Sequence, residues 1–397
     1  MTVLLPGETP FVVLGDDWGR HPSTTQHLFR RVARRFPLVW VNSFGHRTPR
    51  LSARDVARAV EKLRMMWQPA PIAASVDPAE RPRAVVSPRA LPWHDVATVR
   101  AFNRWSLGRD VRRALDSIAP GRRPVVVSAT PIGYDLMTVI DPLASVYLCL
   151  DEYAEGFGVD RDLIGPFERD MLAFADGVTV TARALLDAKR PASGAVLFSP
   201  QGVNYEHFAA PQPIPAEIAA LPRPIFGFAG LMGPAVDYAQ VRALAAARPE
   251  ASIVMVGPWQ TDIAAEQWPA NVHFVGAKPY AELPAWVQQF DVALVPYVHS
   301  AYTRHVDPLK LLEYLAAGVP AVSSGIPEVL KFSGVVEIGD GLEGFIAAVA
   351  RAEVRSGAAE REARQAVARA NTWEVRAVAF VEFADRLATA SGRRAVR

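Results

Sequence analysis

The chain has 397 residues, half of them hydrophobic and 21% charged, with a formal net charge of +2 at pH 7. That length predicts two domains, and that balance excludes disordered and collagen-like chains. The single cysteine, Cys149, cannot form an internal disulfide, and there is neither a signal-peptide pattern nor an apolar stretch long enough to span a membrane, so we expect a soluble, cytoplasmic protein.

The small net charge hides an asymmetry along the chain. Residues 1–124 carry 21 Lys and Arg against 10 Asp and Glu, whereas the remainder carries 22 against 31. The basic part favours an anionic partner such as a lipid headgroup surface, a pyrophosphate or nucleic acid, although a solvated Arg-rich surface explains it equally well. No zinc-finger, RNP-like or basic-zipper pattern is present, so no nucleic acid is expected. Peripheral binding to the inner face of an anionic membrane would use Arg30, Arg31, Arg34, Arg35, Arg50, Arg54 and Arg58.

Short β-branched runs alternate with amphipathic helical stretches, which predicts parallel sheets in an α/β fold. The first half offers six candidate strands: Phe11–Leu14, Leu38–Val41, Val125–Ser128, Val146–Leu150, Val178–Thr181 and Val196–Phe198. The second half offers Ile225–Phe228, Ile253–Val256, Val272–Val275, Val292–Val295, Val319–Val322 and Val335–Ile338. We therefore expect two Rossmann-like domains, residues 1–210 and 211–372, with a proline-punctuated hinge over Pro211–Pro224.

A polar turn follows the first predicted strand. Ser23 and Gln26 have the spacing of a capping box, which predicts the start of a helix. Ligands in open α/β sheets bind beyond the carboxyl ends of the strands and near helix N-termini, so the turn stands where an active site is expected. An ordinary exposed turn is the alternative. The candidate residues are Asp16, Asp17, Trp18, Arg20 and His21.

Two segments match known functional motifs, but their sequence context favours a purely structural role for each. Gly339–Gly344 spells the dinucleotide pattern G-x-G-x-x-G, but the chain from Phe345 onward has a helical pattern, and a dinucleotide site needs a further strand. We interpret it as a glycine-rich turn. Asp160–Asp162 spells D-x-D, a metal–nucleotide motif in some sugar transferases, but it precedes an amphipathic helix whose N-terminal dipole favours acidic residues.

The most informative segment is Asp307–Val322. Pro308 can begin a helix, and Lys310 and Glu313 then lie three residues apart on one face near its start. A lysine there can meet a phosphate beside the helix N-terminus, and a glutamate can accept hydrogen bonds from a ribose diol. The alternative is an ion pair on the helix surface.

This segment resembles the donor site of GT-B glycosyltransferases. The resemblance extends over nearly the whole second half, from the Gln201–Asn204 turn to Asn371–Trp373, which resembles the start of the last helix in that family. It implies two Rossmann-like domains with parallel sheets facing across a cleft, and a helix over residues 373–397 that crosses back to the first domain. It also implies nucleotide-sugar binding, with UDP as the expected nucleotide, at Lys310, Glu313, Gly230, Met232, Tyr297, Val275, Asp307 and Leu309.

The first half is more divergent and is similar to bacterial polysaccharide transferases of the teichuronic-acid and xanthan type. That resemblance implies transfer of a sugar to a saccharide or lipid-linked acceptor in cell-surface or exopolysaccharide synthesis. Asp17 and its neighbours match an acceptor-side turn, and Asp151 matches the acceptor-side aspartate. No cofactor and no metal are expected, because GT-B enzymes generally need no bound metal and the nucleotide-sugar is a substrate.

One departure concerns stereochemistry. Retaining GT-B families carry an E-x7-E pair whose second member would be Glu313, but the first position is His305. This favours inversion, with Asp151 as the general base that deprotonates the acceptor hydroxyl. The alternative for Asp151 is a carboxylate that caps the following helix. The rival functions are a non-catalytic nucleotide-sugar-binding subunit of a polysaccharide complex, a GT-B sugar-nucleotide epimerase and, on the glycine motif alone, a nicotinamide dehydrogenase.

Overall fold

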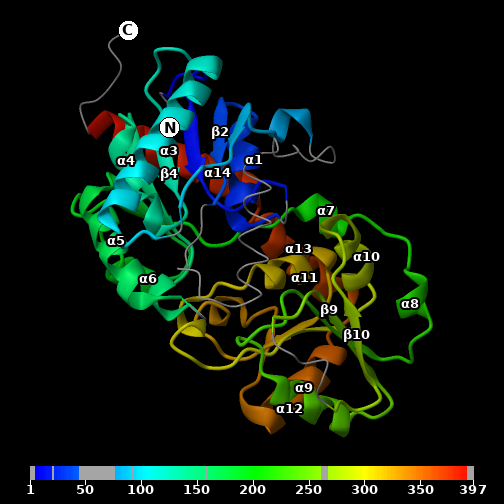
Figure 1. Ribbon diagram of the computed structural model, residues 1–397. Coiled ribbons are helices and arrows are strands. Elements are labelled where there is room, and N and C mark those ends of the chain that lie inside the picture. Colours follow the sequence, from blue (N-terminus) through cyan, green and yellow to red (C-terminus); the bar gives the residue numbers. More distant parts are fainter. Residues whose placement is uncertain are drawn as a thin grey trace. The chain divides into compact units, whose positions relative to one another are not determined.

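The computed structural model describes residues 5–19, 22–43, 77–91, 93–156, 159–260 and 267–390 (Figure 1). The chain divides into two compact units: the first contains residues 1–200 and 376–397, and the second contains residues 201–375. Among the described residues, every helix is too short or too polar to cross a bilayer.

The first unit contains a sheet of seven parallel strands in the order β3-β2-β1-β4-β5-β6-β7. Most of the strand residues are buried, as expected for a parallel sheet covered by helices on both faces. The strands are β1 (Phe11–Leu14), β2 (Leu38–Val41), β3 (Ala84–Val86), β4 (Val125–Ser128), β5 (Ala144–Cys149), β6 (Gly177–Val180) and β7 (Val196–Phe198). The helices are α1 (Thr24–Ala33), α3 (Ala97–Ile118), α4 (Tyr134–Val139), α5 (Arg161–Phe174) and α6 (Ala184–Ala188).

The second unit contains six parallel strands in the order β10-β9-β8-β11-β12-β13. Its strands are β8 (Ile225–Ala229), β9 (Ser252–Val256), β10 (Val272–Gly276), β11 (Val292–Val295), β12 (Ala321–Ser323) and β13 (Glu337–Ile338). Its helices are α7 (Tyr205–Ala209), α8 (Ala216–Ala219), α9 (Tyr238–Ala247), α10 (Leu283–Val287), α11 (Leu309–Ala317), α12 (Gly341–Glu353) and α13 (Ala358–Arg369).

The last helix, α14 (Trp373–Ala390), begins in the second unit and continues in the first from Arg376 onward. There it packs against α1, because the Phe380 and Phe29 rings lie 5.2 Å apart, edge to face. Gly177, at the start of β6, leaves room for Phe383, because a Cβ at this glycine would lie 2.6 Å from that ring.

The expected fold class, two Rossmann-like domains with parallel sheets, is confirmed. Every predicted strand is present with its ends within two residues of expectation. The sequence pattern missed β3, a three-residue strand at the edge of the first sheet. The Pro211–Pro224 segment lies inside the second unit and contains α8, and the hinge expected there stays a prediction.

Candidate active site

The order of strands in the second sheet creates a topological switch point, the position at which open α/β sheets have their ligand crevice. The chain runs from β8 outward to β9 and β10, then returns to place β11 on the other side of β8. Adjacent connections therefore leave in opposite directions at the carboxyl ends of β8 and β11, which is where open α/β sheets bind ligands. Gly230 follows β8 and Tyr297 follows β11 at this point.

Helix α11 begins beside this crevice. Pro308 is its N-cap residue and offers no side-chain cap, and Gly318 ends it with a φ of 75°. The Tyr314 hydroxyl accepts a hydrogen bond from the Ala229 backbone N–H at 2.7 Å, which fixes the helix to the end of β8. Leu309, in the first turn, is partly exposed, so the uncapped N-terminus of the helix remains accessible.

Lys310 projects from the first turn of α11 toward the loop after β8. Its Nζ donates to the Tyr297 hydroxyl at 2.5 Å and lies 4.8 Å from the ring centres of both Phe228 and Tyr297. Gly230 has a φ of 148°, and a Cβ there would lie 2.6 Å from the Lys310 Cε. The glycine thus allows the ammonium group to lie against the loop.

Glu313 lies one turn further along α11 and is only 8% exposed. Burial raises the pKa of its carboxyl to about 7, and the charge of Lys310 opposes that rise. Within the described residues the carboxylate has neither a hydrogen bond nor an ion pair, so the surface ion pair with Lys310 considered from the sequence is wrong. A buried carboxylate with open acceptor positions suits a ligand that brings hydroxyl groups.

The loop Gly230–Met232 offers fewer free amides than its sequence suggests. The Gly230 N–H donates to Val256 and the Met232 N–H to Pro258, both on backbone oxygens, and the Met232 side chain is buried. In the described part of the chain the Leu231 N–H has no such acceptor, so it is the donor that the loop retains for an anion.

Two further donor-site candidates, Asp307 and Val275, occupy positions whose contacts within the chain can be described. Asp307 is buried and accepts from the Gln201 N–H at 2.9 Å and from Lys331 Nζ at 3.0 Å, so both of its oxygens are engaged. Val275 is partly buried in β10, and the next residue, Gly276, turns the chain with a φ of 74°. Their contact with a donor stays a prediction.

The first sheet has a corresponding switch point at the carboxyl ends of β1 and β4. Strands β2 and β3 lie beyond β1, and strands β5 to β7 lie beyond β4. The predicted cap of α1 is confirmed, because the Ser23 hydroxyl accepts from the Gln26 N–H. The Gln26 amide, however, reaches out of the helix to the Asp17 carbonyl oxygen and the Gly19 N–H, and thereby holds the turn after β1.

The turn after β1 is more ordered than its polar sequence suggests. The Trp18 side chain is buried, packs edge to face on Trp40 at 4.9 Å and lies below the Arg30 guanidinium. Desolvation raises the pKa of the Asp16 carboxyl, the Ser23 hydroxyl opposes the rise, and the neighbouring Asp17 adds to it. Asp16 and Asp17 are therefore the polar side chains that the turn presents. Arg20 and His21 lie outside the described residues.

Asp151 follows β5 at the same edge of the sheet. Desolvation raises the pKa of its carboxyl to about 6. Its loop is anchored on both sides: Thr181 Oγ1 donates to the Leu150 carbonyl at 2.5 Å, and Lys189 Nζ pairs with Glu152 at 2.7 Å. The capping alternative is wrong, because Asp160 accepts from the first amides of α5, the helix that follows.

The two literal motifs are ordinary structure, as predicted. Asp160 serves as the N-cap of α5, accepting from the Asp162 and Leu163 N–H groups at 3.1 and 3.2 Å. Gly339 and Asp340 precede α12 and Gly341–Gly344 form its first turn, and the regular elements of the described chain from there to residue 390 are all helices. In the described ranges no three His, Cys, Asp or Glu side chains cluster as a metal site would require.

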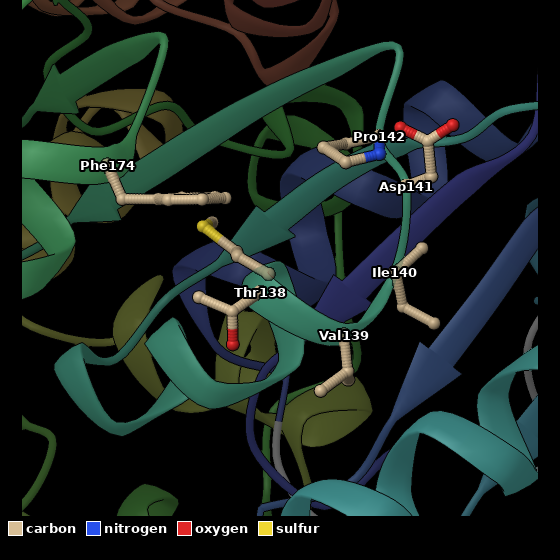
Figure 2. A pocket seen from close by; sticks show the side chains of 7 residues that line it. Thr138, Val139, Ile140, Asp141, Pro142 and Phe174 are labelled. Carbon is tan, nitrogen blue, oxygen red and sulfur yellow. The ribbon is translucent and has the colours of Figure 1, made fainter.

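An open pocket lies at the opposite edge of the first sheet (Figure 2). It has a volume of about 420 Å³ and lies where α4 leads into the amino end of β5, between Met137 and Pro142, with Phe174 at the end of α5. Because ligands of open α/β sheets bind at the carboxyl edge, this pocket does not belong to the candidate site.

The arginines expected to face a membrane are largely engaged where they are described. Arg31 and Arg34 both pair with Glu80, at 3.2 and 2.5 Å, and Arg30 lies over Trp18. Arg35 is exposed. Arg50, Arg54 and Arg58 lie outside the described residues.

Comparisons with known proteins agree with this geometry. Residues 223–353 match the family of glycosyl transferases group 1. The chain is 29% identical over 251 residues to TuaH of Bacillus subtilis strain 168, which is named for a glycosyltransferase of teichuronic acid biosynthesis. That match covers 57% of this chain and 63% of TuaH, so the chain matches less than two thirds of its relative's length.

Two solved structures show the same fold. HepE from Anabaena, in complex with UDP-glucose, has a TM-score of 0.64 at 12% identity, covering 96% of this chain and 100% of HepE. A sucrose-phosphate synthase from Thermosynechococcus elongatus has a TM-score of 0.63 at 16% identity, covering 96% and 100%. At such identities the likeness concerns the fold alone.

Proposed function

We propose that the chain transfers a sugar from a UDP-sugar to a saccharide or lipid-linked saccharide acceptor. The proposal is supported by the match of residues 223–353 to the group 1 glycosyl transferases, by the similarity to TuaH and by the fold shared with HepE. The relation to TuaH supports an acceptor in cell-surface polysaccharide synthesis. HepE has been solved with UDP-glucose, which supports UDP as the nucleotide.

The observation that carries the proposal is the arrangement of Lys310 and Glu313 at the crevice of the second sheet. Breaking a sugar–nucleotide bond places negative charge on the leaving diphosphate, which positioned donors stabilise. Lys310, the uncapped N-terminus of α11 and the Leu231 amide supply such donors, so the reaction proceeds without a metal ion. The Glu313 carboxylate accepts hydrogen bonds from the ribose hydroxyls.

The acceptor binds the first unit at the carboxyl ends of β1 and β5. Asp151 takes the proton of the acceptor hydroxyl, and the turn with Asp16 and Asp17 orients the acceptor sugar. A pKa of about 6 suits a general base, because the carboxylate is then ionised at neutral pH yet more basic than an ordinary aspartate. The acceptor oxygen attacks the anomeric carbon as the diphosphate leaves, which inverts the configuration.

The first experiment is a thermal-shift screen of nucleotides and nucleotide sugars, followed by an assay of UDP release with candidate acceptors. A ligand that binds the folded state raises the melting temperature by an amount that grows with the ratio of free ligand concentration to Kd. We expect UDP and a UDP-sugar to stabilise the chain and UDP release to require an acceptor. Binding without release under every acceptor would indicate a binding subunit, and conversion of the donor without acceptor would indicate an epimerase.

The matched variants are Lys310→Ala and Arg351→Ala. Lys310→Ala should weaken UDP binding or turnover by about 2–3 kcal/mol, as for a charged hydrogen bond lost from a shielded site. Arg351 is an exposed cation of α12 in the same unit. It pairs with Glu337 of β13, and its loss should change neither quantity. If the Lys310→Ala variant kept the UDP affinity and turnover of the wild type, Lys310 would not be part of the donor site.

A further inference from the structure

The loop after β5 is fixed by the residues that flank the Asp151 side chain. Cys149 Sγ donates to the Asp151 carbonyl at 3.3 Å, and the Tyr153 hydroxyl donates to the carbonyl of Ala129, directly after β4. Burial raises the pKa of both the Cys149 thiol and the Tyr153 hydroxyl, so both groups keep their protons and remain donors at neutral pH. The backbone around Asp151 is therefore held in place while its carboxylate stays open.

The residue next to Asp151 belongs to a chain of buried polar groups. Lys189, at the end of α6, donates to Glu152 Oε1 at 2.7 Å and to Glu168 Oε2 of α5 at 2.8 Å. The other oxygen of Glu168 accepts from the Tyr147 hydroxyl of β5 at 2.8 Å. The contacts thus form a closed path, which leaves β5 at Tyr147 and returns to the loop after the same strand at Glu152.

This path is buried, and burial makes it costly. The side chains of Lys189, Glu168 and Glu152 are 6%, 8% and 13% exposed. Desolvation lowers the pKa of the Lys189 ammonium, but the hydrogen bonds to the two glutamates outweigh it, and the pKa lies above its ordinary value. Well-packed apolar side chains of similar volume often stabilise a fold as much as a buried ionic group does, so stability alone gives little reason for this path.

We propose that Glu152 is a positioning residue, which Lys189 holds so that the neighbouring Asp151 carboxylate keeps the direction in which it takes the acceptor proton. The inference rests on the proposed role of Asp151 as the base. Asp151 and Glu152 share a planar peptide unit, so anchoring the Glu152 side chain together with the Asp151 carbonyl restricts rotation of that unit. The Cα–Cβ bond of Asp151 then has one direction. A displacement of about 1 Å at a catalytic group can lower a rate about 10²-fold.

The test changes Glu152, because Lys189 then still pairs with Glu168, whereas loss of Lys189 would leave two buried carboxylates without a cation. Turnover is measured as UDP release from UDP-glucose with the acceptor that the screen identifies. Glu152→Ala should lower kcat about 10–100-fold while UDP affinity stays unchanged, since only the direction of the base is lost. Glu152→Gln keeps an oxygen that accepts from Lys189 and should recover kcat to within about threefold of the wild type.

The control variant lies in the same loop. Glu155 pairs with the exposed Arg161, and Glu155→Ala should leave kcat unchanged. Hydrogen exchange gives a measurement that needs no acceptor: Glu152→Ala should speed exchange of the amides in residues 150–156 about tenfold, because the loop loses its contact with Lys189. Unchanged exchange in that variant would show that Lys189 does not hold the loop, and would overturn the inference.

A double-mutant cycle separates positioning from direct contact with the substrate. If Glu152 acts only through its neighbour, Glu152→Ala should slow the wild type but not the Asp151→Asn variant. Equal slowing in both backgrounds would overturn the inference, because Glu152 would then act independently of Asp151. A slow Asp151→Asn variant beside a Glu152→Ala variant with wild-type kcat would overturn this inference alone. Normal turnover of Asp151→Asn would overturn the assignment of the base, and this inference with it.

Discussion

Two carboxyl groups, Asp151 and Glu313, have pKa values that burial raises, to about 6 and about 7. Carboxyls with pKa values this far above the ordinary range are frequent at functional sites, because desolvation there is tolerated for the sake of chemistry. Neither carboxylate has a partner in the described structure, although Lys310 lies close enough to lower the pKa of Glu313. Both therefore have acceptor positions open to a substrate.

Asp151→Asn should lower turnover about 10²–10⁴-fold while leaving UDP affinity unchanged, because a general base is lost without disturbing the donor site. The base must be deprotonated, so wild-type turnover should fall as pH drops below about 6, the pKa to which burial raises this group. The residual turnover of the variant should lack that decline. Steady-state kinetics across pH and NMR of the product's anomeric configuration check this.

The control is Asp187→Asn, an exposed aspartate of α6 that pairs with Arg190 on the surface and should leave the kinetics unchanged. Near-normal turnover of the Asp151 variant, or a product that retains configuration, would contradict the role as base.

At the scale of elements, the donor site depends on how α11 is joined to β8. The Tyr314 hydroxyl accepts from the buried Ala229 N–H and also lies 3.3 Å from the Ala229 oxygen. No sequence pattern predicted this role, since Tyr314 stands beside Glu313 in the motif and fits the helix as one more apolar position. A polar tip on a buried aromatic residue is the only local signal.

Tyr314→Phe should lower the free energy of unfolding by about 1–3 kcal/mol, because it leaves the Ala229 N–H buried without an acceptor. Tyr205→Phe removes a hydroxyl whose partner is the exposed Arg369, so we expect a change within about 0.5 kcal/mol. Urea unfolding of both variants measures the difference, and equal stabilities would show that the hydroxyl does not hold the helix to the strand.

At the scale of the whole molecule, the two units have the same sheet order around their first strands, yet the chemistry is divided between them. Gly230, Lys310 and Glu313, which we propose bind the donor, lie in the second unit, and Asp151, the proposed base, lies in the first. Each set stands at the carboxyl edge of its own sheet, where adjacent connections leave in opposite directions.

Hydrogen exchange with and without UDP tests this division. We expect UDP to slow exchange in peptides that cover Ala229–Gly233 and Leu309–Ala317, because ligand binding suppresses local opening around its site. Peptides around Asp151 should exchange at unchanged rates with UDP alone. Protection confined to the first unit would place the donor elsewhere and overturn the assignment of Lys310 and Glu313.

The sequence alone determined the fold class, and it predicted the helix on which we propose that the donor binds. The alternation of β-branched runs with helical stretches predicted all of the candidate strands. A parallel strand that is buried on both faces is a continuous run of apolar residues, and such a run is visible in the local sequence. The Ser23 cap and the helix start after Pro308 were predictable for the same reason: each depends on neighbours within a few residues.

Only the tertiary structure decided which polar groups are free to act. Arg31 meets Glu80 from 49 residues away, the Trp18 N–H donates to Asn42, and the Gly230 N–H is taken by Val256 on the neighbouring strand. No local pattern records such partners, since they come from segments that are adjacent in space and distant along the chain. Whether a charge is unpaired, an amide is open or a pKa is raised depends on that long-range packing. The sequence could therefore predict candidate site residues but not the state of their polar groups.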